Sequence, residues 1–488
     1  MNLGISDYTV IRRVFATIPG DVSNDAVGDH APKLEDIYAP ETHAAALDPS
    51  IPIVVGSRGA GKSFWSGVLG QRVTRNAAAV AYPRLHLKDL EVAFGFTGAV
   101  GGPNGISFEM LNSLLAPNAG VDQAKSFWWA TVLRAAARTT GEPPRLSELI
   151  EVGRDWEKRE EVIAKHEQRL RAKDKVLLVV YDALDTVATN WPRRRLLTEA
   201  LLEVVWTMRA YRGIKLKLFL RPDQIDDDAL RFVEIPKLRT GAVRLAWSGT
   251  DLYGLLFARL ALTSDRSAVS SFARLLRSLN IPKPDRNAIL SRRWPLAHDA
   301  QQQARVMDAL AGPYMAAGPY GYKKGKTYDW SLKHLADAFE EVTPRSFLGL
   351  MIAAAKRGPA PQDRVITADG IRHGLREASK TRVDQLHLEF PWIKGVLAPL
   401  AGLLLPQDEE EVFVVWRRAR TIQLVIQDAK ANDYLPPFPV EGQPTERDLF
   451  EALKRIGVMF RRKDDRVDMP DLFRVAARLL KKGGTAPL

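Results

Sequence analysis

The residues with the clearest chemistry form one short stretch, Gly56–Ser63, with the sequence Gly-Ser-Arg-Gly-Ala-Gly-Lys-Ser. It fits G-x-x-x-x-G-K-[ST], the phosphate-binding loop (P-loop), in which backbone N–H groups surround an anion. Glycines lack a Cβ, so the loop can take positive φ values and turn its N–H groups inward. In this pattern Lys62 contacts the β- and γ-phosphates of a nucleotide, and the Ser63 hydroxyl ligates Mg²⁺.

The residues around the P-loop predict the strand and the helix that it requires. Ile51–Val55 is a short apolar run typical of a buried strand, and Phe64–Leu69 continues as a helix. The N-terminal end of that helix adds positive charge where phosphate binds. A glycine-rich turn that happens to contain Lys-Ser is the alternative, and this context disfavours it. We expect nucleotide contacts from Gly56, Ser57, Arg58, Gly59, Ala60, Gly61, Lys62, Ser63 and Phe64.

A second apolar run, Val176–Tyr181, leads directly into the acidic residues Asp182 and Asp185. Continuous apolar residues predict a central parallel strand covered on both faces, and ligands bind at the C-terminal ends of such strands. Asp182 is therefore the expected Mg²⁺ ligand together with Ser63. Asp185 either takes part in catalysis or caps the N-terminus of a helix, and the sequence leaves both interpretations open.

Two arginines are further candidates. The next strand is predicted at Ile214–Leu220, and Arg221 follows it, either facing a γ-phosphate or forming a salt bridge with a nearby carboxylate. Thr343 and Pro344 predict the N-cap and first residue of another helix, which puts Arg345 in its first turn. An arginine there opposes the helix macrodipole, so its presence needs a ligand or a salt bridge to explain it.

Composition excludes several classes of protein. The chain has 488 residues, 46% of them hydrophobic, which predicts roughly two to four domains. It has no cysteine, so disulfides, thiolate catalysis and cysteine-based metal sites are excluded. Because no apolar run approaches the roughly 18 residues that cross a bilayer, and the first residues lack a signal-peptide pattern, we expect a cytoplasmic protein without membrane contact.

Charge and histidines are less specific. Lys and Arg total 70 against 58 Asp and Glu, a formal charge of +12, which suits either a polyanionic partner or a solvated basic surface. The histidines are scattered and show no metal-ligand spacing. His43 is predicted to be a loop residue and His166 a solvent-facing helix residue.

The C-terminal block has a pattern of its own. Thr445 begins a predicted helix that Gly457 closes, residues 458–469 predict a hairpin, and Pro470 opens a helix that runs to Lys481. This order resembles a winged-helix domain. The interleaved Asp464, Asp465 and Asp468 also allow protein docking, whereas four basic residues on and beside the wing suit contact with nucleic-acid phosphates: Arg461, Arg462, Lys463 and Arg466.

These elements predict an α/β fold, in which a P-loop NTPase parallel sheet flanked by helices is followed by a helical lid and a winged-helix domain. We expect an irregular N-terminal arm at 1–45, the P-loop core at 46–262, the lid at 263–384 and the C-terminal domain at 385–488. Further strands are predicted at Ala78–Pro83 and Ala242–Trp247. Further helices are predicted at Phe108–Leu115, Ser126–Arg138, Glu151–Lys173, Arg194–Arg212 and Thr250–Ala261.

Taken in order, five features resemble prokaryotic AAA+/STAND-type P-loop ATPases, including KAP-like and origin-recognition-like proteins. They are the P-loop, the strand ending in Asp182 and Asp185, the Leu-Arg-Pro-Asp ending at 220–223, the Thr-Pro-Arg helix start and the C-terminal block. The resemblance covers residues 46–484, and only the first two motifs are specific. It implies that Arg221 is a sensor-1 residue and that Arg345 is a sensor-2 residue that touches the γ-phosphate. Ala183 departs from the pattern, because many AAA+ ATPases have Glu there to orient water. Asp185 is the expected substitute, or hydrolysis is slow or stimulated.

The resemblance implies an ATP-binding and ATP-hydrolysing switch with Mg²⁺ as cofactor. Its nucleotide state would control assembly into a homo-oligomer or with a partner effector protein or DNA, as in bacterial antiphage systems. The alternative is a nucleotide-dependent DNA-binding loader or regulator in which hydrolysis is secondary. A P-loop kinase is disfavoured because the large basic lid and wing would have no role. Since a fold does not fix a function, these remain hypotheses.

Overall fold

The computed structural model of the chain describes residues 4–18, 31–98, 106–141, 143–188, 191–225, 230–438 and 442–487. The chain forms two compact units, which we describe separately. The sheet unit is residues 22–246, and the helical unit is residues 1–21 together with 247–488. Across the described ranges, every helix is too short or too polar to cross a membrane.

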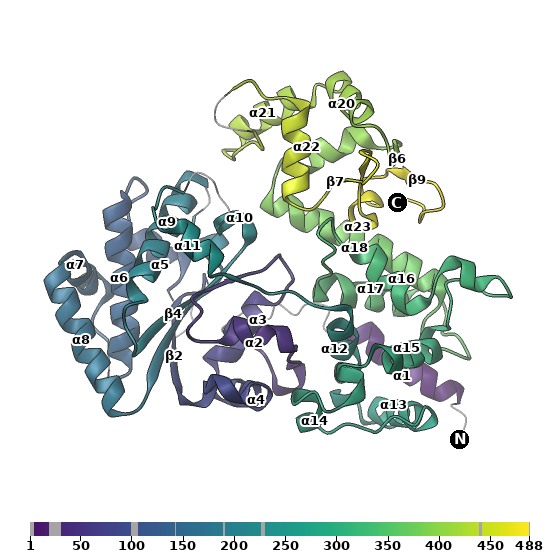
Figure 1. The fold of residues 1–488 in the computed structure, drawn as a ribbon, viewed down its shortest axis with the longest axis horizontal. Coiled ribbons are helices and arrows are strands. Elements are labelled where there is room, and N and C mark those ends of the chain that lie inside the picture. Colours follow the sequence, from purple (N-terminus) through teal and green to yellow (C-terminus); the bar gives the residue numbers. More distant parts are fainter. Residues whose placement is uncertain are drawn as a thin grey trace. The chain divides into compact units, whose positions relative to one another are not determined.

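The described residues of the sheet unit form a five-stranded sheet in the order β2-β3-β4-β1-β5. Figure 1 labels β2 and β4 of this sheet. Every neighbouring pair is parallel, so the predicted parallel α/β sheet is confirmed. Val55 of β1 lies beside Leu220 of β4, and Tyr181 of β3 lies beside Leu218 of β4. These three strands therefore end at one edge of the sheet. The strands are β1 (Ile53–Val55), β2 (Leu90–Phe96), β3 (Val176–Tyr181), β4 (Ile214–Leu220) and β5 (Val243–Arg244).

Helices cover both faces of this sheet. Side chains alternate along a strand, and Val179 and Tyr181 of β3 join the buried cluster formed with α6 and α9. Val180, on the opposite face, is equally buried, and α3 contacts β2, β3 and β4. The helices of this unit are α2 (Ala44–Leu47), α3 (Lys62–Gly70), α4 (Arg72–Ala81), α5 (Phe108–Leu114), α6 (Val121–Arg138), α7 (Leu146–Arg154), α8 (Trp156–Ala172), α9 (Trp191–Met208), α10 (Pro222–Ile225) and α11 (Ile235–Thr240).

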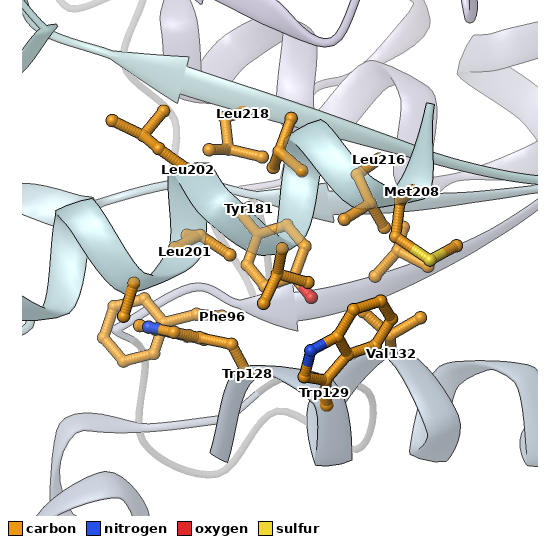
Figure 2. Close-up of a cluster of buried hydrophobic side chains, with 14 of the residues drawn as sticks. Phe96, Trp128, Trp129, Val132, Tyr181, Leu201, Leu202, Met208, Leu216 and Leu218 are labelled. Atoms are coloured by element: carbon orange, nitrogen blue, oxygen red, sulfur yellow. The ribbon is translucent and has the colours of Figure 1, made fainter. Parts of the chain in front are cut away.

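Figure 2 shows the aromatic core that fixes the end of β3. The rings of Trp128 and Tyr181 meet edge to face, with their centroids 5.9 Å apart. The Trp128 indole donates to the carbonyl of Leu197 at 2.9 Å, and the hydroxyls of Tyr181 and Thr131 lie 2.6 Å apart. Because their polar atoms are satisfied, these large side chains can be fully buried. They position Asp182, the next residue of the chain.

The sequence misplaced one strand of this sheet. Ala78–Pro83 was predicted to be a strand, but α4 continues through Ala81 and the strand is β2. Gly95 of β2 lies against the Tyr181 ring, where a Cβ would come within 2.2 Å of a ring carbon. Glycine at this position permits the close approach, and it also weakens the β-strand pattern in the sequence.

The predicted long helix Glu151–Lys173 is two helices, α7 and α8. Asp155 separates them, and its carboxylate accepts hydrogen bonds from the backbone of Glu157 and Lys158 at the start of α8. Ile163, His166 and Leu170 form the buried side of α8. The prediction that His166 faces solvent is therefore wrong, because it occupies the middle of an apolar stripe at helical spacing. Burial lowers the pKa of His166, and Arg169 and Lys165 lower it further.

The helical unit begins with α1 (Ile5–Thr17), which packs against α13 and α17. The irregular structure expected near the N-terminus is therefore wrong for these residues, while residues 19–30 lie outside the described ranges. Asp7 accepts a hydrogen bond from Ser271 at 2.8 Å, and Arg12 donates to the carbonyl of Val365 at 2.7 Å. The other helices through residue 389 are α12 (Gly249–Leu262), α13 (Arg266–Ser278), α14 (Arg286–Leu290), α15 (Ala300–Ala311), α16 (Thr327–Leu335), α17 (Pro344–Lys356) and α18 (Ala368–Glu389).

The C-terminal part contains the predicted helix and hairpin but a shorter last helix. Arg474 is buried, and its guanidinium contacts Asp471 and the carbonyl of Leu479, which holds the chain in a turn. The expected helix to Lys481 is therefore wrong, and a winged-helix architecture stays a prediction. The elements are α19 (Ile393–Leu397), β6 (Leu404–Leu405), α20 (Glu409–Arg418), α21 (Thr421–Ala431), α22 (Glu446–Arg455), the antiparallel strands β7 (Phe460–Arg461) and β8 (Val467–Asp468), α23 (Asp471–Arg474), and β9 (Leu480–Lys481), which pairs with β6 in parallel.

Candidate nucleotide site

The stretch Gly56–Ser63 has the local structure that its sequence predicts, a loop between strand β1 and helix α3. Gly59 and Gly61 have φ values of +83° and +102°, in the left-handed region that favours glycine. The backbone N–H of Gly56 donates to the carbonyl of Leu220 at 3.0 Å, which ties the start of the loop to β4. Helix α3 begins at Lys62, directly after Gly61. The N-terminus of a helix and a loop with two glycines at positive φ are thus combined at one place, as an anion site requires.

The side chain of Lys62 folds back across this loop. Its ammonium donates to the carbonyl of Gly56 at 2.7 Å and to the carbonyl of Ser57 at 3.2 Å. The charge is therefore held over the loop in which a phosphate would lie. A compact ammonium on a flexible stem suits this position, because it can move from carbonyl oxygens to phosphate oxygens.

Asp182 and Ser63 lie near each other at the end of β3. The Ser63 side chain and the positive charge of Lys62 both lower the pKa of the Asp182 carboxyl. Asp182 is 3% exposed, and burial raises the pKa of its carboxyl because a charged group loses its hydration. Contacts with Ser63 and Lys62 oppose that rise, and the Asp185 carboxylate adds to it. The two residues predicted to hold Mg²⁺ are thus neighbours.

Arg221 lies at the end of β4 beside this pair of residues and connects two carboxylates. Its Nη1 lies 3.4 Å from Oδ2 of Asp185, and its Nε and Nη2 lie 2.9 and 2.5 Å from the two carboxylate oxygens of Asp223. The Arg221 side chain is 6% exposed, so this is a buried ion pair rather than the surface salt bridge considered from the sequence. Asp185 lies in a 3-10 turn, Leu184–Thr186, whose N-cap is Ala183. The alternative role for Asp185 as a helix N-cap is therefore not observed.

Two neighbours of this cluster gave no signal in the sequence. Arg194 of α9 is close enough for Arg221, Asp185 and Asp223 to act on its pKa, which burial lowers. The side-chain oxygen of Gln224 accepts a hydrogen bond from the Arg221 backbone N–H at 2.9 Å. Its buried Nε2 has no hydrogen-bond partner among the described residues. Because Gln224 is separated from the P-loop by more than 150 residues, only the order of the strands brings it to this edge.

His43 was predicted to be a loop residue but is fully buried. Its Nδ1 accepts a hydrogen bond from the Trp65 indole at 3.0 Å, and its Nε2 lies 3.0 Å from the carbonyl of Ala246. Since Nδ1 is the acceptor, the proton belongs on Nε2 and is donated to that carbonyl. His43 therefore connects the helix after the P-loop to the segment that follows β5.

Arg345 belongs to the helical unit and has the predicted local structure. Helix α17 begins at Pro344, and the Thr343 hydroxyl accepts from the backbone N–H of Ser346 at 3.3 Å. Arg345 lines a cavity of about 290 Å³ between α17 and α18, with Arg382 among the other lining residues. Its expected contact with a γ-phosphate stays a prediction.

The basic residues of the C-terminal hairpin are largely paired with acidic residues. Arg461 lies 2.7 Å from the Glu409 carboxylate, and Arg466 lies 2.7 Å from the Asp464 carboxylate. Arg462 lies 3.6 Å from both Asp464 and Asp468. Pairing reduces the positive charge that this hairpin offers to a phosphate backbone. Contact with nucleic acid through the hairpin stays a prediction.

No model of a known protein family matches this chain, and no curated protein matches it. Among solved structures it is similar to the Aeropyrum pernix ORC2 protein in ADPNP and ADP complexes, with 13% identity, a TM-score of 0.36, and coverage of 86% of this chain and 84% of that chain. It is also similar to Drosophila ORC bound to DNA, with 12% identity, a TM-score of 0.31, and coverage of 96% and 90%. Both similarities are distant, so the site is interpreted from its own geometry.

Proposed function

We propose that this chain binds ATP with Mg²⁺ at Gly56–Phe64 and Asp182 and hydrolyses the nucleotide. The observation that carries the proposal is that the Ser63 side chain and the Lys62 charge both lie close enough to the buried Asp182 carboxylate to lower its pKa. Because α3 packs on β3, the first turn of the P-loop helix lies near the end of that strand, and both oxygen ligands expected for the metal lie near the charge of Lys62. A structural glycine-rich turn has no need of a buried carboxylate at this point.

The residues present suit Mg²⁺. This ion prefers oxygen ligands and usually takes only one or two from the protein, with phosphate and water supplying the rest. Ser63 and Asp182 provide two such oxygens, and the described residues contain no cluster of three or more acidic or histidine side chains that would favour a site made by protein alone. Bound there, the ion would neutralise the buried Asp182 carboxylate and the negative charge on the phosphates.

We further propose that turnover is slow and that the bound nucleotide acts as a switch. Asp185, the candidate for orienting water, is tied to Arg221, so its carboxylate is not available as an isolated base. A nucleotide can shift a conformational equilibrium only through its different affinity for the two states. We propose that Arg345 creates this difference in affinity by contacting the γ-phosphate of ATP. Assembly with a partner protein or DNA, in a bacterial antiphage system, is the role that the sequence resemblance favours.

Calorimetric titration of ATP into the full chain tests the nucleotide site. Lys62→Ala should abolish tight ATP binding, because its ammonium is the compact charge held over the loop. Lys88→Ala, which removes an exposed lysine of the same unit, is the matched control and should bind ATP like the unchanged chain. Unchanged ATP affinity in a folded Lys62→Ala protein would overturn the proposal.

A further inference from the structure

The connection between α15 and α16, which Figure 1 labels, consists of residues Gly312–Lys326. It contains exposed aromatic and basic side chains. We call this segment the tyrosine–lysine loop. The sequence contains no acidic residue between Asp308 and Asp329. Three tyrosines are exposed to different degrees, and three lysines are exposed beside them. These are Tyr314 (38% exposed), Tyr320 (68%), Tyr322 (55%), Lys323, Lys324 and Lys326.

The loop has a defined shape. Tyr314 and Lys326 form an antiparallel bridge at its base, and the backbone N–H of Met315 donates to the carbonyl of Gly325 at 3.0 Å. Met315 is fully buried and anchors the loop to the unit, while Arg372 donates to its carbonyl. The exposed rings therefore stand on a fixed base. A preformed site loses little conformational entropy when it binds a ligand.

Two lysines near the tip of the loop are available for a ligand. Lys323 and Lys324 form no salt bridge with any residue in the described ranges, in contrast to the paired arginines of the C-terminal hairpin. Lys326, at the base, is close enough to lower the pKa of Asp308, so the proposal does not use it. The Nζ of Lys323 lies 4.9 Å from the centroid of the Tyr320 ring, so the cation and the most exposed ring form one surface.

We propose that the tyrosine–lysine loop binds single-stranded nucleic acid. Tyr320 and Tyr322 stack on bases, and Lys323 and Lys324 contact the adjoining phosphates. A positively charged surface interleaved with aromatic rings is the arrangement that binds single strands without sequence preference. The proposal does not depend on the P-loop, since every residue that it uses belongs to this one loop.

Single strands fit this loop better than two other polyanions. A duplex hides the faces of its bases inside the stack, so the exposed rings of Tyr320 and Tyr322 would gain little from it. An acidic protein segment could satisfy the lysines but would offer the rings no flat π surface. Base stacking is the interaction that uses both features of the loop.

Fluorescence anisotropy tests the proposal with the full chain in the absence of ATP and ADP. The probe is a labelled oligo(dT) of about 12 nucleotides, a length within the usual range of site sizes. Tyr320→Ala and Tyr322→Ala should each weaken binding about fivefold or more. Tyr320→Phe should retain binding, because it keeps the ring. Replacing both Lys323 and Lys324 with Gln should flatten the log–log salt dependence by about 0.7 for each phosphate that the variant no longer neutralises.

Matched charge removal at the C-terminal hairpin, Arg461→Gln with Arg462→Gln, is the control and should leave the salt dependence unchanged. Equal losses of oligonucleotide affinity in the loop and hairpin variants would overturn the assignment, because positive charge alone would then explain binding. Tighter binding of a duplex of the same length, or of polyglutamate, would overturn it in favour of those partners. Since Tyr320, Tyr322, Lys323 and Lys324 are exposed, unchanged thermal melting should accompany each loop variant.

Discussion

The guanidinium of Arg221 holds Asp185 and Asp223 at the C-terminal edge of the sheet, with Asp185 Oδ2 3.4 Å from Nη1 and Asp223 Oδ2 2.5 Å from Nη2. Asp223 is the closer partner and the less exposed, at 16% against 32% for Asp185. The two carboxylates therefore share one cation but differ in how well it holds them. Asp185 is the one that remains more accessible to water near Asp182.

This difference separates a catalytic role for Asp185 from a structural one. Asp185→Asn should slow ATP hydrolysis at least about tenfold while ATP affinity stays nearly constant, because a group that acts on water is needed only in the transition state. Asp223→Asn removes a carboxylate from the same arginine and should reduce stability more than turnover. Steady-state phosphate release and thermal melting of both variants check this. Equal effects on hydrolysis would show that Asp185 only holds Arg221.

Asp182→Asn should have opposite effects on activity and on stability. Hydrolysis should fall at least about tenfold, because the metal loses its anionic ligand. A bound metal stabilises the charge of the transition state by several kcal/mol. The nucleotide-free protein should become more stable near neutral pH. Burial raises the pKa of Asp182, so the ionised carboxylate destabilises the folded state of the unchanged chain. The free energy of unfolding of that chain therefore falls as pH rises from 3.8 through the raised pKa.

Melting temperatures of this variant across pH test the second effect. About 1 kcal/mol corresponds to about 2–4 °C in a domain of this size. The gain over the unchanged chain should shrink as pH falls through the raised pKa and below 3.8, where the carboxyl becomes protonated in both the folded and the unfolded state. A loss of melting temperature at neutral pH would show that the carboxylate is better compensated than its burial indicates.

Arg345→Ala should weaken ATP binding about tenfold or more and leave ADP binding nearly unchanged. A guanidinium that contacts the γ-phosphate makes a charge-assisted hydrogen bond that ADP cannot accept. Arg357→Ala, at the other end of α17, is the matched control, since its exposed side chain lies 3.5 Å from Asp369 on the surface. Calorimetry with both nucleotides measures the difference. Equal losses for ATP and ADP would indicate a structural arginine.

Lys217 should make stability depend on pH in the alkaline range. It is fully buried in β4, and its ammonium donates to the carbonyls of Ala46 at 2.8 Å and Ile51 at 2.7 Å. Burial lowers the pKa of Lys217 to about 7 from 10.5. Between these values the unfolded state binds the proton and the folded state does not, so stability rises as pH increases from about 7 to 10.5.

Urea unfolding across this pH range measures the effect. Lys217→Met should flatten the rise, while Lys215→Met on the same strand should change it less, because Lys215 is only partly buried. Above about pH 10.5, where the amine is neutral in both states, the Lys217→Met protein should be less stable, because two carbonyls lose their donor. An unaltered slope would show that Lys217 stays protonated in the folded protein.

The sequence predicted the parts of the site that local patterns encode. Four local elements have a spacing and residue types with a direct physical meaning: the P-loop, the strand before Asp182, the strand before Arg221 and the cap at Thr343. The structure confirms these elements. Parallel strands that end at one edge then bring Ser63, Asp182 and Arg221 together. Their proposed roles toward a nucleotide stay predictions.

The features that the sequence missed depend on contacts between distant segments. Strand β2 contains Gly95 because the Tyr181 ring packs on it, and no local pattern announces that ring. His43 is polar and follows a proline-containing segment, yet Trp65 and Ala246 satisfy both of its nitrogens in the interior. Arg474 ends the last helix through a carbonyl that lies five residues farther along the chain. In each case tertiary packing overrides the local preference.

Because α1 belongs to the helical unit, the chain passes between the two units twice, once after α1 and once at 246–247. The sheet unit is thus an insertion in the chain of the other unit rather than a bead at the end of a string. A truncation that starts at the P-loop would therefore remove α1, a helix of the other unit, along with everything else before the P-loop.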